Sequence, residues 1–140
     1  MATLDQAVAL AAQAHLGQLD KAGAPYILHP LRVMFRCQSD EARMAAVLHD
    51  VVEDTPITLD DLRQRGFADS VVAAVDRLTR SPDETYEAFI DRVKTDPIAL
   101  EVKIADLEDN MDVRRMADPQ PKDFERLAKY RRAWRELTGR

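Results

Sequence analysis

The sequence predicts an all-α fold, and two observations support it. Between its turn residues the chain repeats apolar side chains at helical spacing. No stretch shows the period-2 alternation of a strand or an Asn-Gly hairpin signal. The 140 residues, 46% of them hydrophobic, suit one domain over residues 1–140 with a single core.

The N-terminal third predicts two helices joined by a loop. Leu4–His15 carries apolar and small residues at helical spacing. Gly17–Tyr26 contains two glycines and a proline, which interrupt the backbone and predict a loop. Apolar periodicity returns up to Phe35. Pro30 stands where the first turn of a helix tolerates proline, so we expect the second helix to begin near His29.

The third helix is expected from Glu41 to about Glu53. Ser39 and Asp40 are suitable N-terminal caps, and Pro56 ends the segment. Further helices follow from the same periodicity and from the positions of turn residues. They are expected over Thr58–Arg65, Asp69–Leu78, Tyr86–Val93, Pro97–Arg115 and Pro121–Leu137. In the last of these we expect a core-facing side made by Phe124, Leu127, Ala128 and Leu137.

Composition argues against several classes of partner. The net charge of −5 gives no basic footprint for polymeric nucleic acid or for an anionic membrane. No apolar run reaches the roughly 20 residues that span a bilayer, and the N-terminus does not resemble a signal peptide, so we expect a cytoplasmic protein. Cys37 is the only cysteine, which excludes an intrachain disulfide and favours a half-buried structural thiol.

The stretch AAVLHDVVEDT, Ala45–Thr55, combines a histidine with three carboxylates. At about 100° per residue, its polar side chains fall within one arc of roughly 140°, opposite an apolar side. These polar residues are His49, Asp50, Glu53 and Asp54. Such a helix would pack its apolar side on the core and present a chemically reactive side.

A second polar strip is predicted on the helix that begins at Pro97. Lys103, Asp106 and Asn110 lie within about 60° by helical spacing, between two apolar sides. A partly buried carboxylate needs a positive partner, because leaving it unpaired costs several kcal/mol. Lys103, one turn away, or a metal ion would meet that need for Asp106.

The histidines and carboxylates together indicate a metal site. A mixed nitrogen and oxygen ligand set suits manganese or iron(II) better than structural zinc, although a single His-Asp pair is more often only a hydrogen-bonded feature. The chain has three histidines, too few for a two-metal site with extra imidazoles. We therefore expect one ion. For His15 we expect a structural role, packed on the glycine-containing loop.

Three motifs resemble, in order and spacing, those of the HD-domain phosphohydrolases, in particular the hydrolase domain of Rel/SpoT proteins and the small alarmone hydrolases. They are AHLGQLDKAGAPYILHP, VLHDVVEDT and VKIADLEDNM. The resemblance implies a compact helical fold around one manganese ion. The ligands it implies are His29, His49, Asp50 and Asp106.

The resemblance also implies roles for other residues. Glu53 and Asp54 would position and activate the attacking water, and Asn110 would contact the nucleotide. The family reaction removes pyrophosphate from the 3′ position of guanosine tetra- or pentaphosphate. Which carboxyl accepts the proton and which returns it stays open.

The chain departs from the family pattern at three positions where basic residues are usual. They hold Asp20, Leu107 and Asp112. Fewer cations and added carboxylates weaken the binding of a highly charged substrate. Lys21 and Lys103 remain as phosphate contacts.

Three hypotheses follow for the function. The first is a metal-dependent hydrolase that releases pyrophosphate from a 3′-pyrophosphorylated guanosine or adenosine nucleotide. The second keeps the chemistry but changes the substrate to a less charged nucleotide or phosphate ester. The third is a module that binds a nucleotide without turnover.

Overall fold

The structure, a computed structural model, describes all residues 1–140 and is helical, which confirms the predicted fold class. The only β contact is an isolated bridge between Leu19 and Pro25 in the loop after the first helix. None of the helices is both long and apolar enough to cross a membrane. The elements are α1 Leu4–Ala14, α2 Leu28–Phe35, α3 Asp40–Leu48, α4 Val51–Asp54, α5 Leu59–Gln64, α6 Asp69–Leu78, α7 Tyr86–Val93, α8 Pro97–Asn110, the 3₁₀ turn η1 Val113–Arg115, and α9 Pro121–Thr138.

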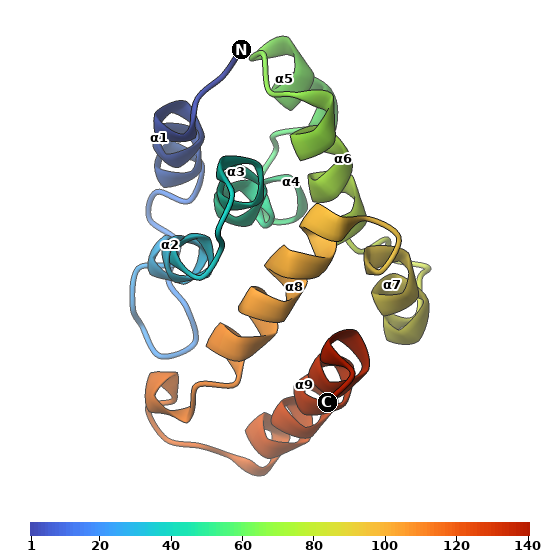
Figure 1. Cartoon of the computed structure of the whole chain (residues 1–140). Coiled ribbons are helices and arrows are strands. Elements are labelled where there is room, and N and C mark those ends of the chain that lie inside the picture. The colour runs from blue at the N-terminus through green and yellow to red at the C-terminus, as the bar shows by residue number, and fades with distance from the viewer.

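Helix α3 lies at the centre of the molecule, with α1 and α2 on one side, α6 on the other and α8 across it (Figure 1). Its buried side is rich in alanine, and small side chains let neighbouring helices approach closely. Ser39 caps its first turn by accepting a hydrogen bond from the Ala42 amide, as predicted. This packing fixes the end of α3, where the predicted site lies.

The predicted helix from Glu41 to Glu53 is divided in two, which corrects the sequence-based boundary. Helix α3 ends at Leu48 and α4 begins at Val51. The carbonyl of Ala46 accepts a hydrogen bond from the His49 ring Nδ1 and a second from the His49 amide. In an uninterrupted α-helix this carbonyl would accept from the amide four residues later, so its capture by His49 ends the helix.

Helix α8 ends at Asn110, not at Arg115 as predicted. Asp112 leaves the helical conformation, and its side chain accepts a hydrogen bond from the Arg114 amide, which begins η1. Aspartate commonly competes with the helix in this way, by bonding to nearby backbone amides. The chain therefore turns away beneath α8 before α9 returns along it (Figure 1).

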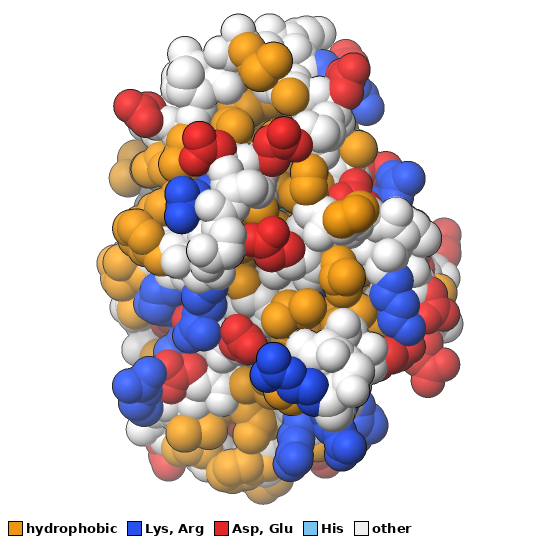
Figure 2. All heavy atoms as spheres, in the orientation of Figure 1, with side chains coloured by type: hydrophobic (Ala, Val, Ile, Leu, Met, Phe, Trp, Pro, Cys, Tyr) orange, Lys and Arg blue, Asp and Glu red, His pale blue; other side chains and the backbone are white.

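Only part of the predicted core-facing side of α9 is buried: Leu137 packs against the core and Leu127 is half-buried, but the other two predicted residues are exposed. Phe124 is 53% exposed and Ala128 is also exposed, whereas Ala133 is buried. Trp134 anchors the contact by donating to Glu108 of α8 across 3.0 Å. Lys and Arg side chains gather on the lower half of the molecular face in Figure 2, where α9 lies.

Cys37 is fully buried, not half buried, and donates to the carbonyl of Val33. Burial raises the pKa of its thiol to about 12. A thiol held in the protonated form is a poor nucleophile, in keeping with the predicted structural role.

Candidate metal centre

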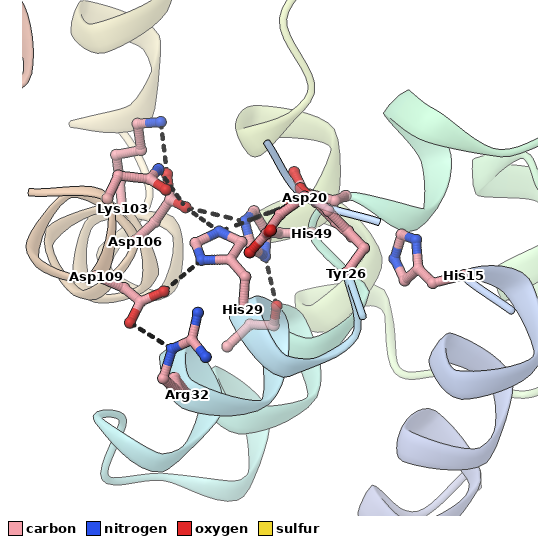
Figure 3. Close-up of polar contacts among 12 residues, drawn as sticks. His15, Asp20, Tyr26, His29, Arg32, His49, Lys103, Asp106 and Asp109 are labelled. Carbon is pink, nitrogen blue, oxygen red and sulfur yellow. Dashed lines mark hydrogen bonds and ion pairs between the residues drawn. The ribbon is translucent and has the colours of Figure 1, made fainter. Parts of the chain in front are cut away.

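The structure brings together the four residues predicted as metal ligands. His29 comes from α2, His49 from the break between α3 and α4, and Asp106 from α8 (Figure 3). Asp50 follows His49 in the same break. The Asp106 Oδ1 atom lies 2.9 Å from His29 Nε2 and 3.3 Å from His49 Nε2. The Asp50 Oδ2 atom lies 3.2 Å from His49 Nε2. Atoms of His29, His49 and Asp50 lie within 4.8 Å of one another, close enough to share one ion.

The other ring nitrogen of each histidine is held outside the centre. His29 Nδ1 donates to Asp109 Oδ2 across 2.6 Å, and His49 Nδ1 donates to the carbonyl of Ala46. Because both Nδ1 atoms carry their protons outward, both Nε2 atoms face the carboxylates at the centre. Metal-ligating histidines use this arrangement, in which an outer hydrogen bond fixes the ring and its tautomer. The donor set therefore fits a divalent cation.

The electrostatics of the centre favour positive charge. Burial alone would lower the pKa of His49, but Asp50 and Asp106 outweigh it and raise that pKa to about 9. Burial also acts against ionisation of Asp106, yet Lys103 and the two histidines hold its pKa well below the usual range. A divalent cation bound among these carboxylates would supply the positive charge that protonated histidines supply in its place.

Lys103 and a metal ion are compatible partners for Asp106. The Lys103 ammonium contacts Asp106 Oδ2 at 2.9 Å, while Oδ1 faces the two imidazoles. One oxygen of the Asp106 carboxylate thus pairs with Lys103, and the other faces the two imidazoles, where an ion would bind.

Asp109 is a site residue that the sequence analysis missed. Its side chain is fully buried, one turn after Asp106 on α8. Besides His29 it contacts Arg32 Nε at 2.8 Å and Arg115 Nη1 at 3.0 Å. Burial by itself would raise its pKa, but the hydrogen bonds from His29 and Arg32 and the charge of Arg115 lower the pKa to about 2. Asp109 therefore orients His29 as a permanent carboxylate, and its spacing of three from Asp106 was the available sequence signal.

Replacing Asp109 by asparagine is expected to weaken metal binding by about 10- to 100-fold, the usual cost of losing an outer partner of a ligating histidine. Calorimetric titration of manganese into the metal-free protein would measure the change. Glu108→Gln is the matched control, since Glu108 is the adjacent acid of α8 and bonds to Trp134. Equal manganese affinity in Asp109→Asn and the control would show that Asp109 does not position a ligand.

Tyr26 ties the loop after α1 to the centre, and the sequence analysis also missed this contact. Its hydroxyl donates to Asp50 Oδ2 across 2.5 Å. The ring lies 5.1 Å from that of His15, which is buried beside the loop as predicted and contacts Gln18 at 2.8 Å. His15 thus supports the loop, and the loop supports a predicted ligand.

The predicted catalytic carboxyls follow the ligands in α4 but differ in position. Glu53 lines a cavity together with His49, Asp50 and Asp106, whereas Asp54 is not part of its wall. Partial burial raises the pKa of both carboxyls, and the charge of Asp50 raises each further. A raised carboxyl pKa suits proton transfer near neutral pH.

Two cavities lie on either side of the centre. The smaller, about 190 Å³, is lined by three of the predicted ligands, His49, Asp50 and Asp106, and by the predicted phosphate contact Lys103. The larger, about 560 Å³, contains predicted substrate contact Lys21 and lies among the loop after α1, η1 and α9. Asn110 and Tyr130 line both cavities. The charged residues of the larger cavity are Asp20, Lys21, Asp112, Arg115, Asp118, Asp123 and Arg126.

The side chain of Asn110, predicted to contact the nucleotide, is held at both ends. Its amide nitrogen donates to Asp106 Oδ1 at 3.2 Å, and its oxygen accepts from Arg115 Nη1 at 3.1 Å. In this arrangement Asn110 orients Asp106, a predicted metal ligand, and forms part of the wall of both cavities.

The three departures from the family pattern lie in different surroundings. Asp20 accepts hydrogen bonds from the Ala22 and Ala24 amides, both 2.9 Å, and its other oxygen lies 3.7 Å from Arg115. Asp112 pairs with Arg114 at 2.7 Å and lines the larger cavity. Leu107 is fully buried in the core and lines neither cavity, so this position supplies no phosphate contact in this chain.

Comparison with known proteins agrees with this geometry. The family model described as the HD domain matches residues 7–129. The chain is 38% identical over 121 residues to a GTP pyrophosphokinase of Streptomyces coelicolor, covering 77% of this chain and 14% of that protein. It is 34% identical over 135 residues to the guanosine-3′,5′-bis(diphosphate) 3′-pyrophosphohydrolase of Haemophilus influenzae, covering 86% of this chain and 20% of that protein. The chain thus spans a fifth or less of the length of these curated relatives.

A solved structure shares the fold. Its title is "A metazoan ortholog of SpoT hydrolyzes ppGpp and plays a role in starvation responses", and it superposes on this chain with a TM-score of 0.80. The sequences are 24% identical, and the match covers 98% of this chain and 85% of that one. Fold, motifs and centre define the class of metal-dependent HD-domain proteins. The chain belongs to the HD-domain family, which confirms the resemblance noted from its motifs.

Proposed function

We propose that this chain is a metal-dependent phosphohydrolase of a small nucleotide, with a 3′-pyrophosphorylated guanosine nucleotide as the first candidate substrate and manganese as the ion. One observation carries the proposal. Two imidazoles with fixed outer hydrogen bonds meet Asp50 and Asp106 beside Glu53, between two cavities. A core that only needed packing would not bury this set of polar groups around a single point.

The residues of the centre would have separate roles in the hydrolysis of a phosphate ester. His29, His49, Asp50 and Asp106 would hold the ion. When bound, a divalent ion stabilises charge on phosphoryl oxygens and makes water a better nucleophile at neutral pH. Glu53, at the cavity wall with a raised carboxyl pKa, would accept the proton of the attacking water and return it to the leaving group.

Two observations bear on the substrate, and they favour different candidates. The Haemophilus influenzae relative is named for 3′-pyrophosphate removal from guanosine-3′,5′-bis(diphosphate). Four aspartates line the larger cavity of this chain against three cations, which disfavours a substrate with two diphosphate groups. The second candidate is therefore a less charged nucleotide or phosphate ester hydrolysed by the same centre.

Replacing Asp20 by asparagine is expected to lower KM for a 3′-pyrophosphorylated guanosine nucleotide by about tenfold, since it removes a negative charge beside Arg115. Asparagine keeps the oxygen that accepts the two loop amides, so the turn should persist. Steady-state kinetics at two salt concentrations would measure the effect, which should shrink at high salt. Asp60→Asn on α5, outside both cavities, is the control. An unchanged KM in Asp20→Asn would show that this charge does not govern substrate choice.

The test of the function is a panel of nucleotides incubated with manganese-loaded protein, read by release of pyrophosphate and of phosphate. Release of pyrophosphate from 3′-pyrophosphorylated guanosine supports the first candidate. Turnover restricted to less charged compounds supports the second. No turnover across the panel, with metal shown to be bound, would contradict the proposed activity and leave a binding module.

A further inference from the structure

The smaller cavity contains two cations with no ion-pair partner. Arg80, between α6 and α7, and Lys129, on α9, both line it. Neither forms an ion pair with a carboxylate. Arg80 Nε donates to the backbone carbonyl of Glu84 at 3.1 Å, and both cations lie against the ring of Tyr86. The Arg80 Cζ atom is 5.6 Å and the Lys129 Nζ atom 4.1 Å from the ring centroid. By contrast, the third cation of this cavity, Lys103, is committed to Asp106.

Tyr86 adds a donor that nothing in the protein uses. Its hydroxyl oxygen is buried and has no hydrogen-bond partner, although the residue lines the cavity. The ring is held by its two cations and by Phe89, whose centroid lies 6.1 Å away. A buried hydroxyl without a partner costs stability, so its persistence points to a group that binds there.

Mutual repulsion among the cations supports the same conclusion. Burial lowers the pKa of Lys129, and the charges of Arg80, Lys103 and Arg126 lower it further. The carboxylates of this cavity, Asp50, Glu53 and Asp106, belong to the predicted centre, and none of them forms an ion pair with Arg80 or Lys129. The larger cavity contains four aspartates against three cations, whereas the smaller contains three carboxylates and three cations, two of which have no ion-pair partner.

We propose that Arg80, Lys129 and the Tyr86 hydroxyl bind the diphosphate group of the substrate in the smaller cavity, while the nucleoside occupies the larger one. The inference rests on the proposed function and deepens it by assigning each end of the substrate to one cavity. Cavity size agrees, since 560 Å³ suits a nucleoside and 190 Å³ a smaller anionic group. These cations come from segments that the three family motifs do not include.

Titration calorimetry with inorganic pyrophosphate tests this assignment in the metal-free protein, where the probe cannot act through an ion. Lys129→Met and Arg80→Gln are each expected to weaken pyrophosphate binding by about tenfold, the loss of one charged contact. Tyr86→Phe should weaken it by a smaller factor and keep the fold, as judged by circular dichroism. Arg132→Gln is the control, because Arg132 is an exposed cation of α9 outside both cavities.

Several outcomes would overturn the inference. These are unchanged affinity in Lys129→Met and Arg80→Gln, an equal loss in Arg132→Gln, or orthophosphate binding as tightly as pyrophosphate. The two proposals can fail separately. Pyrophosphate binding that depends on Arg80 and Lys129 would stand even if the nucleotide panel showed no turnover. If the protein hydrolysed a nucleotide but its affinity for pyrophosphate did not depend on Arg80 or Lys129, only the proposed diphosphate site would be rejected.

Discussion

The His49→Ala variant is expected to lose stoichiometric metal and to lower kcat/KM by about a thousandfold or more. The substitution removes one of two imidazoles from the centre and leaves Asp50 and Asp106 facing each other with less compensation. It also frees the Ala46 carbonyl, which His49 now holds. The same residue thus ends a helix and is predicted to supply a ligand atom.

Elemental analysis after dialysis would measure the metal content of His49→Ala, alongside turnover of the best nucleotide of the panel. Removing a partner from a buried ionic group can destabilise the fold by about 3–5 kcal/mol, so thermal unfolding must be followed as well. His49→Gln gives a second variant with a polar side chain. Arg132→Gln should keep full metal and activity. A folded His49→Ala protein with one bound ion per chain would contradict the proposed ligand set.

The Glu53→Gln variant is expected to lower kcat by about 10²- to 10⁴-fold, the usual contribution of a general acid or base. Metal content should not change, since Glu53 lies beside the predicted ligands and is not one of them. Glutamine keeps the size and hydrogen-bonding capacity of the side chain but cannot accept the proton. A loss of kcat with metal retained separates proton transfer from assembly of the centre.

Asp54→Asn is the informative comparison for Glu53→Gln. Asp54 does not line either cavity beside the centre, so its replacement should lower kcat much less. Single-turnover kinetics and metal analysis on both variants would measure the difference. A larger loss in Asp54→Asn would reverse the assignment of the two carboxyls and make Asp54 the proton acceptor.

The helices could be predicted because apolar periodicity is a local property, but their ends were predicted less well. The break after Leu48 depends on the His49 ring capturing the Ala46 carbonyl, a choice favoured by carboxylates distant in sequence. The early end of α8 depends on Asp112 bonding to the Arg114 amide. Apolar periodicity does not reveal a side chain that replaces a backbone hydrogen bond and so ends a helix.

The polar strip on α8 could be predicted because it depends only on the spacing of residues within one helix. Lys103 and Asn110 stand three and four residues from Asp106, and both contact it, at 2.9 and 3.2 Å. Asp109 escaped notice because its burial depends on partners from α2 and η1, Arg32 and Arg115. Residue spacing within a helix identifies side chains that are neighbours on that helix. It cannot identify Asp109 as a site residue, because the partners of Asp109 lie on α2 and η1.

The meeting of His29 with Asp106 joins points 77 residues apart along the chain. An ion shared by them would act as a removable cross-link, absent from the denatured state, whose loop-closure entropy grows with the enclosed length. Metal at about 100 times its Kd would add about 2.7 kcal/mol to the free energy of unfolding. Chelation would then lower the melting temperature together with the activity, so thermal denaturation offers a measure of ion occupancy that requires no substrate.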